Sequence, residues 1–285
     1  NTNLAVPLVL TPTLAVTEAD YKPRNTVAAV YAQVLEDLGK AVTLLPTDVE
    51  DGVVTKDAAR AMLSRVYLMQ GNYATARDVA NSVISGGNYG LTPSFEEAFA
   101  DDTASPEIIF SIIVSEQDGV NNMNTFYAST DNQGRGDIRV QTKHLALYEA
   151  ADQRGRFFET VNSRVFTLKF ADQYGDVPIV RLAEMYLTRA ECNQRLGTTT
   201  GAAPKDDVNR IRQRAGLSGL VAVTLNDILK ERKLELAFEG HQVHDIKRTK
   251  GVVGATPFSA NNLVLPIPQR EMDTNNKLVQ NPGYN

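Results

Sequence analysis

A pair of short amphipathic segments within residues 56–85 constrains the fold of this chain more than any other feature. Two small side chains, Ser64 and Ala76, fall where two antiparallel helices would approach each other most closely. Leu63 is spaced to fill the gap beside them, and Gly71-Asn72 provides a turn between the helices. The sequence therefore predicts a packed helical hairpin.

The same hairpin matches the tetratricopeptide repeat pattern. Five residues fall at the spacing of the L-G-x2-Y…A-x3-F signature, namely Leu63, Ser64, Tyr67, Ala76 and Ala80. Arg60 stands where the repeat usually has tryptophan. A chance amphipathic hairpin is the alternative interpretation.

Further helices are indicated by apolar side chains that recur every three or four residues, over 26–43, 178–196, 204–215 and 225–248. Residues 1–24 contain three prolines and cannot supply a helix to cover the first of these. We therefore expect the sequence to be truncated at its N-terminus.

A long insertion separates the two helical blocks and contains strand-like runs at 107–114 and 164–170. Loops held by a rigid scaffold are common places for binding chemistry. We predict a single domain over 1–285, divided into tetratricopeptide-like helices at 26–86, a loop-rich ligand-facing insertion at 87–177, a second helical block at 178–250 and an extended tail at 251–285.

The tail contains the run L-V-L-P-I-P at 263–268. Its two prolines remove backbone donors and favour an extended path that neither a helix nor a central strand could use. The apolar side chains of Leu265 and Ile267 are expected to dock beside the predicted helix 225–248.

Three passages resemble the SusD/RagB family of surface nutrient-binding lipoproteins. They are residues 6–46, residues 178–212, and a terminal cassette that runs from Glu231 through E-G at 239–240 to the proline-rich tail. At 242–244 this sequence has Q-V-H, where the family commonly has an arginine and an aromatic pair, and this departure weakens a local ion pair.

The resemblance implies a mainly α fold, an α-α superhelix of tetratricopeptide-like helix pairs with a loop-rich insertion containing short β-strands. It also implies a surface-exposed lipoprotein of the outer membrane that partners a SusC-like TonB-dependent transporter. Membrane association is expected only through an N-terminal lipid anchor outside this sequence, because Cys192, its one cysteine, falls inside a predicted helix.

Composition and motifs exclude several other classes. A net charge of −5 without a basic run argues against nucleic acid as a partner. No stretch approaches about 18 consecutive apolar residues, so no membrane-spanning helix is predicted. Three histidines and one cysteine do not form a metal motif, and neither a phosphate-binding loop nor a nucleophile elbow occurs. We expect no catalytic residue, no metal and no cofactor.

The charged residues Glu231, Arg232, Glu235 and Glu239 look catalytic in isolation. Their spacing of three or four residues on an amphipathic helix is also what structural ion pairs require. We favour the structural interpretation.

Residues 118–137 combine amides with flat rings, a mixture that suits sugars. A ring covers the C–H face of a pyranose, while amides and a guanidinium group bind its hydroxyls. The predicted ligand-binding residues are Asn121, Asn122, Asn124, Phe126, Tyr127, Arg135 and, from a second segment, Tyr174. A polar, disordered surface loop is an equally supported interpretation, and the sequence has no tryptophan.

The favoured function is non-enzymatic binding of a nutrient oligomer, with an oligosaccharide as the favoured ligand, and its delivery to the transporter. The alternatives are a tetratricopeptide-like protein-interaction scaffold and a peptide-binding member of the same family. Glycoside hydrolysis has only unspecific carboxylates in its favour.

Overall fold

The structure, a computed structural model, describes residues 2–49, 52–100 and 105–284. The chain divides into two compact units. The larger unit spans residues 41–242, and the smaller one combines residues up to 40 with those from 243 onwards. The single domain predicted over 1–285, with its internal boundaries, stays a prediction.

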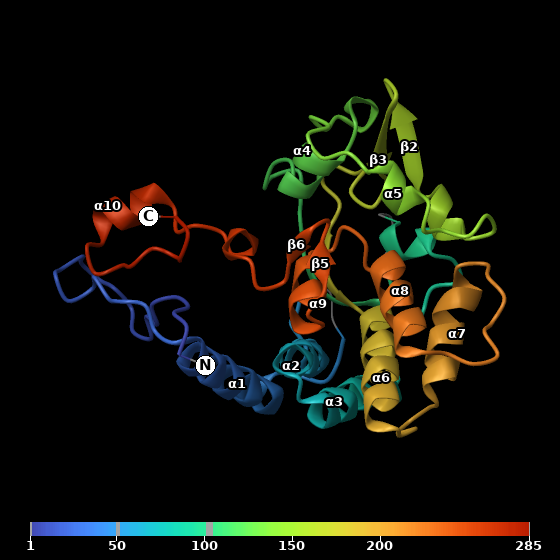
Figure 1. The fold of residues 1–285 in the computed structure, drawn as a ribbon, viewed down its shortest axis with the longest axis horizontal. Helices are drawn as coiled ribbons and strands as arrows, with labels where there is room; N and C mark the ends of the chain where they lie inside the picture. Colours follow the sequence, from blue (N-terminus) through green and yellow to red (C-terminus); the bar gives the residue numbers. More distant parts are fainter. Residues whose placement is uncertain (1, 50–51, 101–104, 285) are drawn as a thin grey trace. The chain divides into compact units, whose positions relative to one another are not determined.

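Helices form one side of the larger unit, where α3 packs against α2 and α6, and α6 packs against α7 and α8 (Figure 1). Their bounds are α2 Lys56–Gln70, α3 Tyr73–Gly86, α6 Leu182–Leu196, α7 Pro204–Arg214 and α8 Leu225–Glu235. The mainly α fold expected from the sequence is confirmed.

The α2–α3 hairpin forms where the sequence predicts it. Thr55 caps α2 by accepting a hydrogen bond from the backbone N–H of Ala58 at 3.2 Å. Gly71 ends α2 in the left-handed conformation, with φ of +75°. At the crossing, the Ser64 hydroxyl donates to the carbonyl oxygen of Ala76 at 3.0 Å, and both residues are fully buried. The expected close approach of the two small residues is therefore confirmed.

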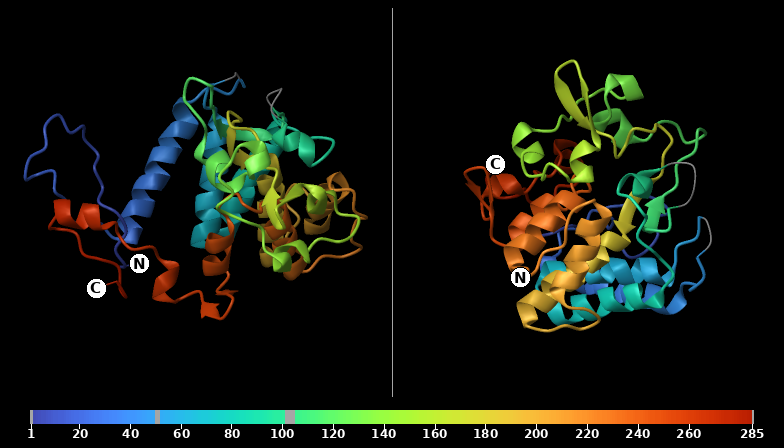
Figure 2. Two further views of the ribbon diagram at one scale, coloured as in Figure 1. Left: turned by 90° about the horizontal axis from the view of Figure 1, so that it is seen from above. Right: turned by 90° about the vertical axis from the view of Figure 1, so that its right-hand side faces the viewer.

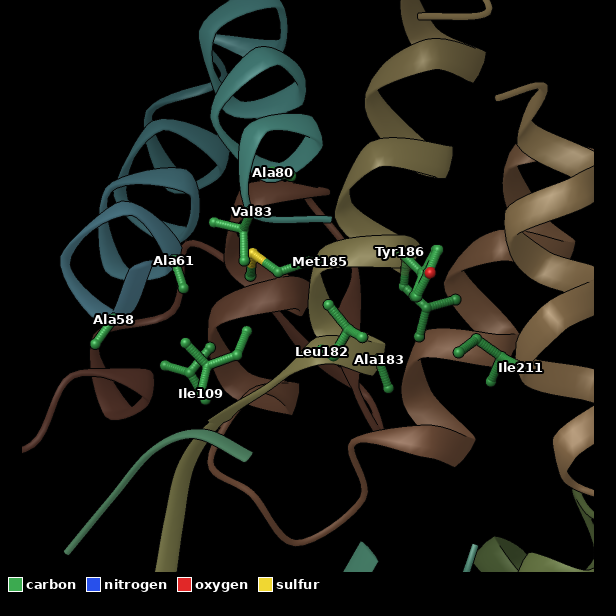
Figure 3. Packing of buried hydrophobic residues seen from close by; sticks show 12 residues of the cluster. Ala58, Ala61, Ala80, Val83, Ile109, Leu182, Ala183, Met185, Tyr186 and Ile211 are labelled. Carbon is green, nitrogen blue, oxygen red and sulfur yellow. The ribbon is translucent and has the colours of Figure 1, made fainter. Parts of the chain in front are cut away.

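Helix α6 lies at the centre of the core, since every residue from 182 to 193 is buried. Apolar side chains from α2, α3, β1 and α7 meet it in one cluster, shown in Figure 3. The labelled members are Ala58, Ala61, Ala80, Val83, Ile109, Leu182, Ala183, Met185, Tyr186 and Ile211.

The insertion adds short strands and helical turns. Strand β1 (Ile108–Ile112) pairs antiparallel with β4 (Val177–Arg181), and β2 (Phe158–Val161) pairs antiparallel with β3 (Arg164–Thr167). The short helices are η1 Glu96–Phe99, α4 Asn122–Tyr127, η2 Thr130–Asn132, α5 Thr142–Leu145 and η3 Gln153–Arg156. Figures 1 and 2 show the β2–β3 hairpin at the end of the larger unit opposite α3.

Two predicted helix boundaries are wrong. The helix predicted from residue 178 begins at 182, because 177–181 pairs with β1 as a strand. The helix predicted over 225–248 is two helices, α8 and α9 (Gln242–Arg248). Phe238 and Gly240 have φ of +69° and +80°, and a right-handed helix cannot pass through left-handed residues.

The smaller unit contains the start of α1 (Val27–Leu44), and after α9 it contains β5 (Val252–Val253), β6 (Thr256–Pro257), η4 (Asn261–Leu263) and α10 (Gln269–Thr274). The prediction of a wholly extended tail is wrong, because Pro268 caps the start of α10. Proline is well tolerated at a helix N-terminus, where its missing N–H has no intrahelical partner.

Polar contacts hold the tail to the N-terminal segment. The Arg24 guanidinium donates to the carbonyl oxygen of Val279 and to Asn281 Oδ1, both at 2.8 Å. Asn275 Nδ2 donates to the carbonyl oxygen of Lys22 at 3.0 Å. Leu265, expected to be an apolar anchor, is 83% exposed. The prediction that its side chain is buried is therefore wrong.

Across the described ranges, none of the helices combines the length and apolarity needed to cross a bilayer.

Candidate ligand-binding site

A pocket of about 340 Å³ opens in the insertion of the larger unit. Three segments that are distant in sequence meet there: η1 with the start of β1, the N-cap of α4, and the chain from 168 to 178. Its lining includes Phe99, Asn121, Lys169, Phe170, Tyr174 and Asp176. The pocket thus offers aromatic rings beside an amide, an ammonium group and a carboxylate.

Tyr174 is the most accessible aromatic residue of this pocket, with 36% of its surface exposed. Its backbone N–H donates to Asp172 Oδ1 at 2.7 Å. Nearby, Asp176 Oδ1 accepts from the backbone N–H of Val114 at 3.0 Å, which ties the end of the loop to the chain after β1. Both carboxylates line the pocket and also hold its backbone in place.

Two asparagine side chains donate hydrogen bonds to the backbone of the loop that carries Tyr174. Asn121 Nδ2 donates to the carbonyl oxygens of Asp172, Gln173 and Gly175, at 3.2, 3.1 and 3.1 Å. Asn124 Nδ2 donates to those of Asn132, Phe170 and Ala171, at 3.1, 3.1 and 3.0 Å. Asn121 Oδ1 also caps α4 by accepting from the backbone N–H of Asn124 at 2.7 Å.

The structure distributes the seven predicted ligand-binding residues over three settings. Asn121 and Tyr174 line the pocket. Asn124 is fully buried and Tyr127 is half-buried with its ring 5.4 Å from that of Phe170, and neither residue lines the pocket.

The remaining three residues form an exposed surface that is not part of the pocket lining: Asn122, Phe126 and Arg135. The Arg135 guanidinium lies 4.9 Å from the centre of the Phe126 ring and pairs with Asp137. A ligand role for this surface stays a prediction.

Sequence reasoning missed Phe99 and Lys169. The Lys169 ammonium lies 4.8 Å from the centre of the Phe99 ring and donates to Glu239 Oε1 at 2.6 Å. Burial, opposed by the charge of Glu239, lowers the pKa of Lys169 to about 8. No local signal marks these residues, because they are distant in sequence and meet only in the folded structure.

A buried ionic cluster lies behind the pocket. The Arg181 guanidinium pairs with Glu107, Glu235 and Glu239 at 2.5, 3.1 and 2.8 Å. Further pairs join Arg214 to Glu107 and Glu235, and Arg154 to Glu231 and Glu235. The structural interpretation of Glu231, Arg232, Glu235 and Glu239 agrees with the ion pairs that these residues form. Glu231 pairs with Arg212, Arg232 with Glu184, Glu235 with Arg181, and Glu239 with both Arg181 and Lys169.

Glu235 is unsuited to acid catalysis. Burial alone would raise the pKa of Glu235, but the guanidinium groups of Arg214 and Arg181 outweigh burial and hold it well below its usual range. Its carboxyl group is therefore ionised at neutral pH. Among residues 2–49, 52–100 and 105–284, no cluster of three His, Cys, Asp or Glu side chains could hold a metal ion.

Comparisons with known proteins agree with this architecture. A model described as the SusD family matches residues 168–256, and one described as "Starch-binding associating with outer membrane" matches residues 5–68. SusD-like protein P2 of Formosa agariphila is 28% identical over an alignment of 328 residues, which covers 90% of this chain. The chain spans only 65% of that protein's length.

Two further relatives are similar over different extents. The starch-binding protein SusD of Bacteroides thetaiotaomicron is 32% identical over 124 residues, covering 38% of this chain and 22% of that protein. A putative sugar binding protein from Bacteroides vulgatus has a similar structure, with a TM-score of 0.87 and 28% identity. That likeness covers 99% of this chain and 70% of the other.

Fold and pocket together define a helical scaffold that carries a mixed aromatic and polar pocket on a loop-rich insertion. With both family matches and these relatives, the chain belongs to the SusD/RagB family.

Proposed function

We propose that the protein binds an uncharged or weakly charged oligosaccharide at the cell surface and does not turn it over. The observation that carries this proposal is the partly exposed ring of Tyr174 beside Asn121, Asp172 and Asp176 in one pocket. The ring offers a flat apolar face to a pyranose, and the carboxylates of Asp172 and Asp176 can accept hydrogen bonds from its hydroxyls. Two of the relatives are named for starch and sugar binding, which supports the same ligand class.

Binding without turnover is supported by the state of the acidic groups. Asp172 and Asp176 accept hydrogen bonds from backbone N–H groups, and the buried glutamates are paired with arginines. A glycosidase needs one carboxyl group that stays protonated beside another that is ionised. The described residues of the pocket give no sign of such a division.

We further propose that the bound oligosaccharide passes to a SusC-like TonB-dependent transporter in the outer membrane. The family description that matches residues 5–68 refers to association with the outer membrane. Copurification of the full-length protein with the transporter after mild detergent extraction is the expected result. Separate elution of the two proteins at every detergent concentration would contradict the partnership.

Calorimetry with a panel of soluble oligosaccharides and a panel of peptides tests the binding proposal. A stacked ring contributes on the order of 1 kcal/mol beyond burial, so we expect dissociation constants of roughly micromolar to millimolar. Tyr174→Ala should weaken oligosaccharide binding about fivefold or more, whereas Phe126→Ala, outside the pocket, should not.

The same experiment separates the alternatives. Weaker binding by Phe126→Ala alone would move the site to the Phe126 and Arg135 surface. Binding of peptides alone would favour the peptide-binding alternative. Release of shorter saccharides on incubation, detected by chromatography, would show that the protein is an enzyme.

A further inference from the structure

We infer that Asn121 and Asn124 act as positioning residues that hold the loop 170–175 in the shape that binds ligand. This inference rests on the proposed function, because the loop presents Tyr174 to the pocket. It gives the two asparagines a different role from the direct ligand contact that the sequence predicts.

Backbone carbonyl groups of this loop converge on two amide nitrogens. Five carbonyl oxygens of this loop accept hydrogen bonds from Asn121 Nδ2 or Asn124 Nδ2, those of Phe170, Ala171, Asp172, Gln173 and Gly175. The segment has no helix or strand hydrogen bonding of its own. Buried or partly buried carbonyl groups in an irregular segment need other donors, and the two side chains supply them.

The chemistry of the amide explains why asparagine suits both positions. Its Nδ2 carries two hydrogens and no acceptor, so it can bridge several carbonyl oxygens at once. An ionised aspartate has the same shape but only acceptors, and would face these carbonyl oxygens with a negative charge. A serine or alanine side chain is too short to reach three carbonyl groups.

The two asparagines also connect the loop to a rigid element. Asn121 is the N-cap of α4, and Asn124 lies in the first turn of that helix. Asn124 further binds the carbonyl oxygen of Asn132, at the end of η2. The shape of the loop is therefore set by the α4 and η2 region rather than by the ligand.

This arrangement affects affinity through entropy. A loop that is already ordered loses little conformational freedom when it binds a ligand. Without the two amide groups the loop would become ordered only on binding, and the dissociation constant would rise. Asn124 gives the cleaner test, because it is fully buried and absent from the pocket lining, so its loss removes no direct ligand contact.

The experiment compares Asn124→Ala with Asn122→Ala, an exposed neighbour in the same helix. Hydrogen exchange of the backbone amides at 170–176 is measured first, and calorimetry follows with an oligosaccharide that binds the unchanged protein. We expect Asn124→Ala to exchange faster at 170–176, to regain protection at saturating oligosaccharide, and to bind about tenfold more weakly. Asn122→Ala should match the unchanged protein in exchange at 170–176.

Unaltered exchange at 170–176, or unaltered affinity with faster exchange, would overturn the inference. If Asn124→Ala does not fold, Asn121→Ser replaces it, because serine keeps a helix cap but cannot reach the loop carbonyls. The inference then requires faster exchange at 170–176 in Asn121→Ser than in the unchanged protein. If the unchanged protein binds no oligosaccharide, the proposed function fails, whereas the exchange measurement still decides whether the asparagines hold the loop.

Discussion

At the residue scale, the buried charges of the larger unit have the clearest energetic consequence. The Glu235 carboxylate pairs with three guanidinium groups, those of Arg154, Arg181 and Arg214. Removing one charge from a buried cluster leaves its partners uncompensated. We therefore expect Glu235→Gln to lower the free energy of unfolding by about 3 to 5 kcal/mol, measured by urea denaturation.

A matched control is Glu271→Gln in α10, whose partner Arg270 is largely exposed. An exposed pair contributes about 0 to 1 kcal/mol, so this variant should unfold close to the unchanged protein. Equal destabilisation by the two variants would show that the cluster around Glu235 is not the buried network described here.

Residue types alone predict part of the site. Asn121 and Tyr174 were identified because amides and rings suit sugars, and both line the pocket. Asn124 has the same side chain as Asn121, but it donates hydrogen bonds to loop carbonyl groups. The residue type alone does not reveal this arrangement. Phe99 and Lys169 carry no local signal, because they are distant in sequence and only the folded structure brings them to the pocket.

At the element scale, apolar periodicity predicts the helices well but not every boundary. The hairpin at 56–86 agrees closely with its prediction, because the N-cap Thr55 and the turn residue Gly71 mark its ends in the sequence. The predicted helix 225–248 is interrupted because apolar spacing does not report the left-handed conformations at Phe238 and Gly240. A bulky residue at positive φ is uncommon, and tertiary packing must impose it.

Alanine substitutions at Gly240, between α8 and α9, and at Gly39, inside α1, should change stability in opposite directions. Gly240 has φ of +80° and open space where a Cβ would lie, so Gly240→Ala costs only backbone strain, about 1 to 2 kcal/mol. Gly39, inside α1, likewise has open space, and Gly39→Ala should stabilise by roughly 0.5 to 1 kcal/mol. The melting temperatures of the two variants measure both effects. A Gly240→Ala variant more stable than the unchanged protein would contradict the left-handed turn.

At the scale of the whole molecule, the buried ionisable groups set how stability depends on pH. Burial lowers the pKa of His144 and of His241 to about 4, from an ordinary value of 6.5. Burial would raise the pKa of Glu239, but Arg181 and Lys169 outweigh it and lower that pKa to about 2. In each case the unfolded chain binds protons first as the solution is acidified.

Stability should therefore be greatest above pH 6.5, fall between pH 6.5 and 4 as the histidines protonate in the unfolded chain, and fall further below pH 4.5. Glu231 and Asp207 act in the opposite direction, because burial raises the pKa of each. Melting temperatures recorded from pH 8 to pH 3 measure the balance. Two results together would contradict the assignment of both histidines as buried and neutral. The melting temperature would stay constant or rise between pH 6.5 and 4, and Glu231→Gln and Asp207→Asn would leave that pH dependence unchanged.

The central claim, that the pocket carrying Tyr174 binds an oligosaccharide, is tested most directly by a crystal structure with the best ligand from calorimetry. We expect a sugar ring against the face of Tyr174, with its hydroxyl groups bonded to Asp172 or Asp176. A saccharide bound instead against Phe126 and Arg135, with the Tyr174 pocket holding only solvent, would contradict the account.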